Sequence, residues 1–199
     1  MRVYGMNGGI TTVNLARIYY PVTTLGPGKR VGIWLAGCDR DCPECVSPEL
    51  KSRSSGTPVT VDEIMKHVKQ LCADADGFTI SGGEPFYNPI ETGALVSAIN
   101  EITNEIIIFT GYTLEELRDM QDENVDYVLD NISVLIDGPF IAELNDGVGL
   151  RGSSNQNIHI FKHMEEYEHL IDCERGMQVV VNGDRVMTIG IPLVSKDEN

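Results

Sequence analysis

The sequence has little positive charge and no long apolar run. Of its 199 residues, 15 are Lys or Arg and 30 are Asp or Glu, so that the formal net charge is -15 at pH 7. Such an acidic chain repels phosphate backbones and anionic lipids, which argues against nucleic acid or a membrane as a partner. No apolar run approaches the ~20 residues of a membrane-spanning helix, and MRVYGMNGG at the start lacks the apolar segment of a secretory signal. The sequence therefore predicts a cytoplasmic protein.

Cysteine is also scarce, and it is unevenly distributed. The chain has five cysteines, and three of them, Cys38, Cys42 and Cys45, lie within GCDRDCPEC at residues 37–45. An odd and clustered set suits a metal or redox site in a reducing compartment better than a disulfide framework. A length of 199 residues suits one compact domain, so we expect a single domain over residues 1–199.

The apolar pattern predicts strands that alternate with helices. Apolar runs predict strands at residues 30–37, 77–80, 105–109, 132–136 and 157–161. Helix starts are indicated by capping boxes at Thr60 with Glu63 and Thr113 with Glu116, and by Asn88 followed by Pro89. QVVVNGDRVMTI, residues 178–189, predicts a hairpin that turns at Asn182 and Gly183. Together these elements predict an α/β fold around a parallel sheet.

Four of the loops that follow predicted strands carry polar or glycine-rich sequence. They are the cysteine loop, SGGEP at 81–85, TGY at 110–112 and DGPF at 137–140. Ligands of parallel α/β sheets bind beyond the carboxyl ends of the strands. We therefore expect these four loops to meet in one pocket.

Three thiolates at CxxxCxxC spacing can hold an iron–sulfur cube and leave one iron open to a ligand. A structural zinc site would need a fourth ligand, which Cys72, Cys173 or a histidine would have to supply. The spacing favours the cluster, with zinc as the alternative. We otherwise expect Cys72 to be a small buried residue, Cys173 to be an ordinary loop thiol, and the histidines to be solvated.

CxxxCxxC directly after one strand, followed by SGGEP after the next, resembles the radical S-adenosylmethionine (SAM) enzymes. The resemblance implies a partial, open β/α barrel of the radical SAM type with mainly parallel strands, followed here by the C-terminal hairpin. It also implies that Cys38, Cys42 and Cys45 hold a 4Fe-4S cluster whose open iron binds the amino and carboxylate groups of S-adenosyl-L-methionine. An electron from the cluster then cleaves SAM to methionine and a 5′-deoxyadenosyl radical, which removes a hydrogen atom from the substrate. Glu44 stands where many members of this family carry an aromatic residue.

The resemblance assigns the SGGEP segment to the amino group of the cofactor. This segment comprises Ser81, Gly82, Gly83 and Glu84, and Glu84 would supply a carboxylate for the ammonium group. Independently of the resemblance, we interpret the two glycines as positions where backbone approaches a ligand closely.

Polar residues after later strands are further candidates for binding the cofactor. Thr110 and Asp137 would either orient its methionine end, hold a small cation, or cap the adjacent turn. Donors and acceptors suited to the ribose hydroxyls come from Ser153, Ser154, Asn155 and Gln156. Arg151 would face a carboxylate or form a surface salt bridge.

Longer segments resemble the activases of glycyl radical enzymes, in particular the subgroup that serves anaerobic ribonucleotide reductases. They are LGPGKRVGIWLAGC at 25–38, IIIFTGYTLEEL at 106–117, VLIDGPF at 134–140 and LRGSSNQNIHIF at 150–161. These segments place the core at about 13–161, with the hairpin at about 177–190. The resemblance implies an activating enzyme with a glycyl radical enzyme as partner, expected to be anaerobic ribonucleotide reductase, and reduced flavodoxin or ferredoxin as electron donor. Gly26 and Gly28 of the GPG sequence, which precede Arg30, either form a tight turn or help to present the partner's peptide.

Two other functions remain open at this point. A small radical SAM enzyme that modifies a peptide or a metabolite would produce 5′-deoxyadenosine without a glycyl radical in the reductase. A binding module without catalysis would hold zinc, or a cluster whose spectrum does not respond to SAM.

Overall fold

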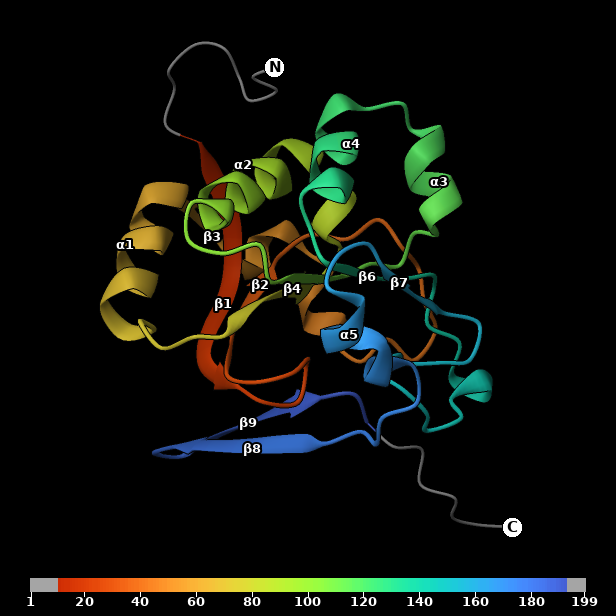
Figure 1. Ribbon diagram of the computed structural model, residues 1–199. Helices are drawn as coiled ribbons and strands as arrows, with labels where there is room; N and C mark the ends of the chain where they lie inside the picture. The colour runs from red at the N-terminus through yellow and green to blue at the C-terminus, as the bar shows by residue number, and fades with distance from the viewer. Residues whose placement is uncertain (1–10, 193–199) are drawn as a thin grey trace.

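A mixed seven-stranded sheet forms the centre of the protein in the computed structural model, which describes residues 11–192 (Figure 1). The strand order is β3-β1-β2-β4-β5-β6-β7. The strands are β1 (Thr12–Val22), β2 (Arg30–Leu35), β3 (Thr57–Thr60), β4 (Gly77–Gly82), β5 (Ile106–Phe109), β6 (Val134–Asp137) and β7 (Asn157–Ile160). A separate hairpin follows, made of β8 (Met177–Asn182) and β9 (Arg185–Gly190).

The sheet is parallel at its centre and antiparallel at both sides. β2, β4, β5 and β6 pair in parallel, whereas β1 pairs antiparallel with β2 and β3, and β7 pairs antiparallel with β6. The predicted α/β fold with a parallel core and a C-terminal hairpin is confirmed. The expectation of mainly parallel strands is corrected, because three of the six strand pairings are antiparallel. The sheet is open at β3 and β7, and the radical SAM type of barrel stays a prediction.

Helices cover both faces of the sheet. The helices are α1 (Val61–Leu71), α2 (Pro89–Asn100), α3 (Leu114–Asp119), α4 (Glu123–Asp130) and α5 (Met164–Tyr167). Figure 1 shows α2 and α4 above the sheet and α1 at its left, beside β1, with α5 and the hairpin below. Successive side chains of β5 point to opposite faces of the sheet. Ile106 and Ile108 pack in the core with α1, α2 and α4, and Ile107 packs with Tyr167 of α5. No helix among residues 11–192 is long and apolar enough to span a lipid bilayer.

The predicted helix starts are confirmed. Both capping boxes form, and Asn88 accepts a hydrogen bond from the backbone of Glu91. The hairpin is confirmed too, although its turn is formed by Gly183 and Asp184, because Asn182 still pairs with Arg185.

Arg30 is buried under the central strands, with only 1% of its surface exposed. Its guanidinium donates to Thr79 Oγ1 at 2.8 Å, to the carbonyl of Phe78 at 2.6 Å and to the carbonyl of Glu105 at 2.9 Å. A Cβ on Gly26 would lie 2.7 Å from Cδ of Arg30, so the GPG turn needs glycine where it folds over this side chain. Gly26 therefore belongs to a tight turn over Arg30, and a role of the GPG sequence in presenting the partner's peptide stays a prediction.

Replacing Arg30 with methionine is expected to lower the free energy of unfolding by roughly 3 kcal/mol. Each buried acceptor that loses its donor costs about 1–3 kcal/mol, and burial of apolar surface by methionine offsets part of that loss. Urea denaturation of the apoprotein measures the effect. Arg17→Met is the control, because the Arg17 side chain is 34% exposed; equal losses in the two variants would contradict the role given to Arg30.

Candidate metal centre and cofactor pocket

A hollow open to solvent lies at the carboxyl ends of the parallel strands. It holds about 860 Å³ of empty space, part of it outside the protein surface. All four loops that the sequence singled out contribute to its wall, as expected. Its lining includes Cys38, Arg40, Cys42, Cys45, Val46, Ser47, Lys51, Ser81, Gly82, Gly83, Glu84, Phe109, Thr110, Gly111, Gly138, Phe140, Gly152, Gln156 and Ile191.

The cysteine loop leaves β2 and is fixed by backbone hydrogen bonds. The N–H of Cys38 donates to the carbonyl of Lys51 at 2.9 Å, and the N–H of Arg40 donates to the sulfur of Cys38 at 3.3 Å. Cys38, Cys42 and Cys45 are all half-buried at the wall of the hollow. Burial raises the pKa of the Cys38 thiol. Binding of a metal therefore requires that the thiol lose its proton.

The donors at the hollow fit an iron–sulfur cluster better than a closed zinc site. Within residues 11–192, the cysteines and histidines that line the hollow are Cys38, Cys42 and Cys45 alone. Cys72 lies in the apolar core at the end of α1, and Cys173 packs partly buried beside α5. Neither supplies the fourth ligand that tetrahedral zinc requires. Three soft sulfur donors around an open space suit a cluster with one iron left free.

Gly82 and Gly83 join the glycine-rich loop to the cysteine strand. The N–H of Gly83 donates to the carbonyl of Leu35, and the N–H of Glu84 donates to the carbonyl of Gly37, each at 2.8 Å. A Cβ would lie 2.2 Å from the oxygen of Leu35 if added to Gly82, and 2.3 Å from the oxygen of Gly37 if added to Gly83. Both glycines line the hollow, but the structure requires glycine because two backbones touch. The close approach of a ligand to these two glycines stays a prediction.

Glu84 is buried between the two loops, with 2% of its surface exposed. Its Oε1 accepts from the N–H of Phe86 at 2.9 Å and from Thr110 Oγ1 at 2.8 Å, while Oε2 accepts from the N–H of Gly111 at 2.7 Å. Burial raises the pKa of Glu84 to about 7, and these hydrogen bonds oppose the shift. Glu84 thus ties SGGEP to TGY and places a carboxyl group at the wall of the hollow.

The stability of the apoprotein is expected to fall as the pH rises from about 4.5 to about 7. The folded state, in which the pKa of Glu84 is about 7, still binds a proton that the unfolded state has released above its ordinary pKa of 4.5. The unfolded state therefore binds fewer protons in this window, and the free energy of unfolding decreases with pH. The decrease is on the order of 3 kcal/mol.

Urea denaturation at pH 5 and pH 8 measures this decrease. Glu84→Gln is expected to remove most of the difference between the two pH values, because glutamine carries no charge to bury. Glu115→Gln, at an exposed position of α3, serves as the control. The same pH dependence in both variants would show that Glu84 is not its source.

Asp137 does not border the hollow and instead caps α3. Its Oδ2 accepts from the N–H of Leu114 at 2.7 Å and lies 2.8 Å from His159 Nε2, while Oδ1 accepts from the N–H of Asn157 at 3.1 Å. These contacts give Asp137 the capping role that was its alternative, and its expected cofactor or cation role stays a prediction. The expectation that His159 is solvated is wrong, because Asp137 holds this imidazole half-buried against the sheet.

The segment after Leu150 uses its polar side chains mainly to close its own loop. Ser153 Oγ accepts from the N–H of Ile141 at 3.1 Å, and Asn155 donates to the carbonyl of Pro139 at 2.8 Å. Gln156 donates to the carbonyl of Gly138 at 2.6 Å and also borders the hollow. Ser153 and Asn155 do not line the hollow, and their expected contact with the ribose hydroxyls stays a prediction.

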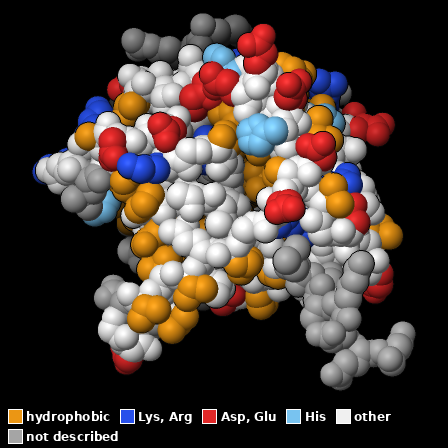
Figure 2. All heavy atoms as spheres, turned by 60° about the horizontal axis from the view of Figure 1, so that its bottom comes forward, with side chains coloured by type: hydrophobic (Ala, Val, Ile, Leu, Met, Phe, Trp, Pro, Cys, Tyr) orange, Lys and Arg blue, Asp and Glu red, His pale blue; other side chains and the backbone are white. Residues whose placement is uncertain are grey.

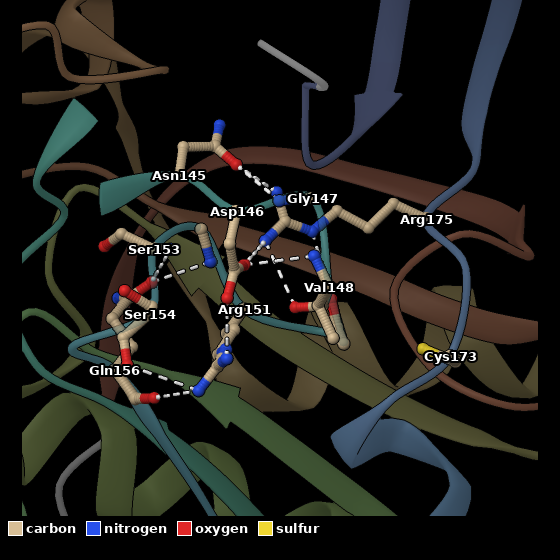
Figure 3. A network of polar contacts seen from close by, with 12 residues as sticks. Asn145, Asp146, Gly147, Val148, Arg151, Ser153, Ser154, Gln156, Cys173 and Arg175 are labelled. Carbon is tan, nitrogen blue, oxygen red and sulfur yellow. Dashed lines mark hydrogen bonds and ion pairs between the residues drawn. The ribbon is translucent and has the colours of Figure 1, made fainter. Parts of the chain in front are cut away.

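Arg151 does not line the hollow and pairs with Asp146. Figure 3 shows the two side chains together with Arg175, which approaches the same carboxylate. Arg151 lies 2.8 Å from Asp146, and Arg175 lies 3.5 Å from it. Of the two roles considered for Arg151, the structure shows the salt bridge.

Several residues of the hollow were missed from the sequence. Arg40 lies 4.6 Å from the ring centre of Tyr112 and 3.4 Å from Glu116, and Lys51 lies 3.2 Å from Asp41. Phe109, Phe140 and Ile191 add an apolar wall. A cation inside the CxxxC spacing was a usable signal for Arg40. Lys51 and Ile191 lie outside every motif, and the fold alone brings them to the cysteines.

Known proteins match most of the chain. Residues 24–159 match the family described as "4Fe-4S single cluster domain". The anaerobic ribonucleoside-triphosphate reductase-activating protein of Vibrio cholerae is 37% identical over 153 residues, which is 72% of this chain and 96% of that protein. Its Escherichia coli counterpart is 34% identical, over 71% of this chain and 95% of the relative, and that of Enterobacteria phage T4 is 31% identical, over 73% and 93%.

Proposed function

Because the chain belongs to the family of anaerobic ribonucleoside-triphosphate reductase-activating proteins, we propose that it is a radical SAM activase that generates a glycyl radical on a partner enzyme. The partner is an anaerobic ribonucleotide reductase, as the names of the relatives indicate for those proteins. The observation that carries the proposal is that three thiols and the glycine-rich loop share one open hollow that offers no fourth thiol among the described residues.

In this proposal Cys38, Cys42 and Cys45 hold a 4Fe-4S cluster and leave one iron for S-adenosylmethionine. When bound, the cluster supplies one electron that breaks the bond between sulfur and C5′ of the cofactor. Methionine would leave as a neutral thioether, and the 5′-deoxyadenosyl radical would take a hydrogen atom from the α-carbon of a glycine. The products are 5′-deoxyadenosine and a glycyl radical. The electron comes from reduced flavodoxin or ferredoxin.

The residues around the thiols have separate tasks. Glu84 pairs with the ammonium group of the cofactor. Hydrogen bonds from Thr110 and Gly111 hold the carboxylate of Glu84 in place. Arg40 and Lys51, the cations among the described lining residues, face the carboxylate of the cofactor. Glu44 has φ of 55° and does not line the hollow. The adenine therefore packs on the apolar wall formed by Phe109, Phe140 and Ile191.

Glu84→Gln is expected to keep the cluster and to raise the Kd for S-adenosylmethionine about tenfold or more. A hydrogen bond to a charged group contributes about 1.5–3 kcal/mol, and every 1.4 kcal/mol changes Kd about tenfold. Equilibrium dialysis with labelled cofactor measures Kd, and iron and sulfide analysis measures the cluster. An unchanged Kd would remove Glu84 from the cofactor site, with Glu115→Gln again as the control.

Anaerobic incubation with the reductase tests the whole reaction. The reconstituted protein, dithionite, S-adenosylmethionine and the purified reductase are expected to yield both 5′-deoxyadenosine and an organic radical signal on the reductase. 5′-Deoxyadenosine without that signal would instead support an enzyme that modifies a peptide or a metabolite.

A further inference from the structure

A surface groove continues from the cofactor hollow along strand β9. It is lined by Arg17, Tyr19, Val46, Ser47, Glu49, Val180, Val186, Met187 and Thr188. Val46 and Ser47 also line the hollow, directly after the third cysteine, so the two depressions meet at the cysteine loop. Figure 2 looks onto this side of the molecule, where apolar side chains of the hairpin form a band along the lower edge. Anything that lies in the groove therefore reaches the cysteine loop.

One wall of the groove is the free edge of a strand. In β9, Arg185 is the partner of Asn182 next to the two-residue turn, and Val186 is the partner of Val181. Pairs in an antiparallel hairpin alternate between hydrogen-bonded and non-hydrogen-bonded, and the pair that closes a two-residue turn is hydrogen-bonded. The backbone groups of Val186 and Thr188 therefore point away from β8. Within residues 11–192, no backbone hydrogen bond from outside the hairpin reaches them.

The lining of the groove mixes polar and apolar side chains and is balanced in charge, with one arginine and one glutamate. Val46 is 59% exposed and Val186 is 67% exposed, and both border it. The charged residues of the lining are Arg17 and Glu49, which form an ion pair at 3.8 Å. The groove is therefore close to neutral, although the whole chain has a net charge of -15. A free strand edge beside apolar side chains suits an uncharged, extended polypeptide, which adds a strand through main-chain hydrogen bonds.

We propose that this groove binds an extended segment of the partner reductase, paired with the edge of β9, so that the adjoining glycine enters the hollow past Val46 and Ser47. The proposal rests on the proposed function, because it names the docking surface for the protein substrate of that reaction. The six residues of β9 extend over about 20 Å, which sets the bound segment at roughly six residues. The cofactor site then needs no enclosure of its own on this side, since the docked segment covers it.

Val186→Glu and Val179→Glu form a matched pair of test variants. Both valines are exposed on the hairpin, at 67% and 62%, but Val179 lies on β8 and does not line the groove. Val186→Glu is expected to raise the Kd for the purified anaerobic ribonucleoside-triphosphate reductase at least tenfold, measured by calorimetry, and to lower the glycyl radical yield in proportion. Val179→Glu is expected to change neither quantity by more than about twofold.

Thr188→Pro tests the hydrogen bonding of the strand edge by a second route. Proline is tolerated on an edge strand where the N–H faces outward, so the hairpin is expected to form while one donor to the docked segment is lost. This variant is expected to weaken reductase binding at least fivefold.

Two results would overturn the proposal. One is that Val186→Glu and Thr188→Pro bind the reductase as well as Val179→Glu does. The other is that Val186→Glu changes the sedimentation of the protein alone and leaves reductase binding intact, which would make the groove a contact between copies of this chain. Cleavage of S-adenosylmethionine by the wild-type protein without reductase is measured separately. Its absence would refute the proposed function, while the binding comparison would still decide the role of the groove.

Discussion

Replacing Cys38 with serine is expected to leave no intact 4Fe-4S cluster and no detectable cleavage of S-adenosylmethionine. A serine hydroxyl is a poor ligand for iron compared with a thiolate, and the set of three has no spare member. Cys42 and Cys45 are the other thiols at the hollow, and no described histidine lines it. Iron and sulfide content after anaerobic reconstitution measures the cluster, and 5′-deoxyadenosine released after reduction with dithionite measures cleavage.

Cys72→Ser and Cys173→Ser are the controls for this prediction. Cys72 is 7% exposed in the core at the end of α1, and Cys173 contacts the carbonyl of Leu170 beside α5. Both variants are expected to hold the same amount of iron as the wild type. Loss of the cluster in either variant, or its retention in Cys38→Ser, would show that the assigned ligand set is wrong.

The second large effect is expected from Gly82→Ala, which is predicted to lower the free energy of unfolding by about 3–5 kcal/mol. Gly82 has φ of 126°, a conformation that alanine rarely adopts, and its added Cβ would lie 2.2 Å from the oxygen and 2.4 Å from the nitrogen of Leu35. Both atoms are backbone, so relief requires β2 and β4 to separate at their carboxyl ends. That is the point from which the cysteine loop and the glycine-rich loop leave the sheet.

Gly176→Ala is the matched control for Gly82→Ala. Its added Cβ would lie 3.2 Å from a methyl group of Thr24, a side-chain contact that needs only a small shift. Urea denaturation of the apoproteins measures both variants. Similar losses of stability would contradict the account of why glycine is required at position 82.

The sequence predicted the centre of the sheet better than its edges. Continuous apolar runs identified β2, β4, β5 and β6, which are buried on both faces. β1 and β3 were missed because they lie at one side of the sheet: the burial of β1 varies along its length, and TPVT of β3 contains a proline that is typical of a loop. The orientation of β7 was not predictable from its own residues. The chain leaves β6, stays at that end of the sheet to build the wall of the hollow, and returns antiparallel.

The parts of the site that could be predicted are likewise those defined by neighbouring residues, and the parts that could not are those defined by residues distant in the sequence. CxxxCxxC and SGGEP were recognisable because each carries its spacing within a few residues. For Asp137 and Ser153 the sequence did not reveal the contacts seen in the structure, since a carboxylate or a hydroxyl beside a pocket can accept from a backbone N–H as readily as it can bind a ligand. Whether it does so depends on Leu114 and Ile141, which are distant in sequence. For Gly82, likewise, the decisive neighbour is Leu35 on another strand.

Electron paramagnetic resonance of the reconstituted, dithionite-reduced protein, recorded with and without S-adenosylmethionine, tests the central claim most directly. If Cys38, Cys42 and Cys45 are the whole protein ligand set, the fourth iron is open, and adding the cofactor is expected to change the g values of the reduced cluster. A spectrum that is the same with and without a saturating amount of S-adenosylmethionine would mean that the fourth position is closed, and it would contradict the account.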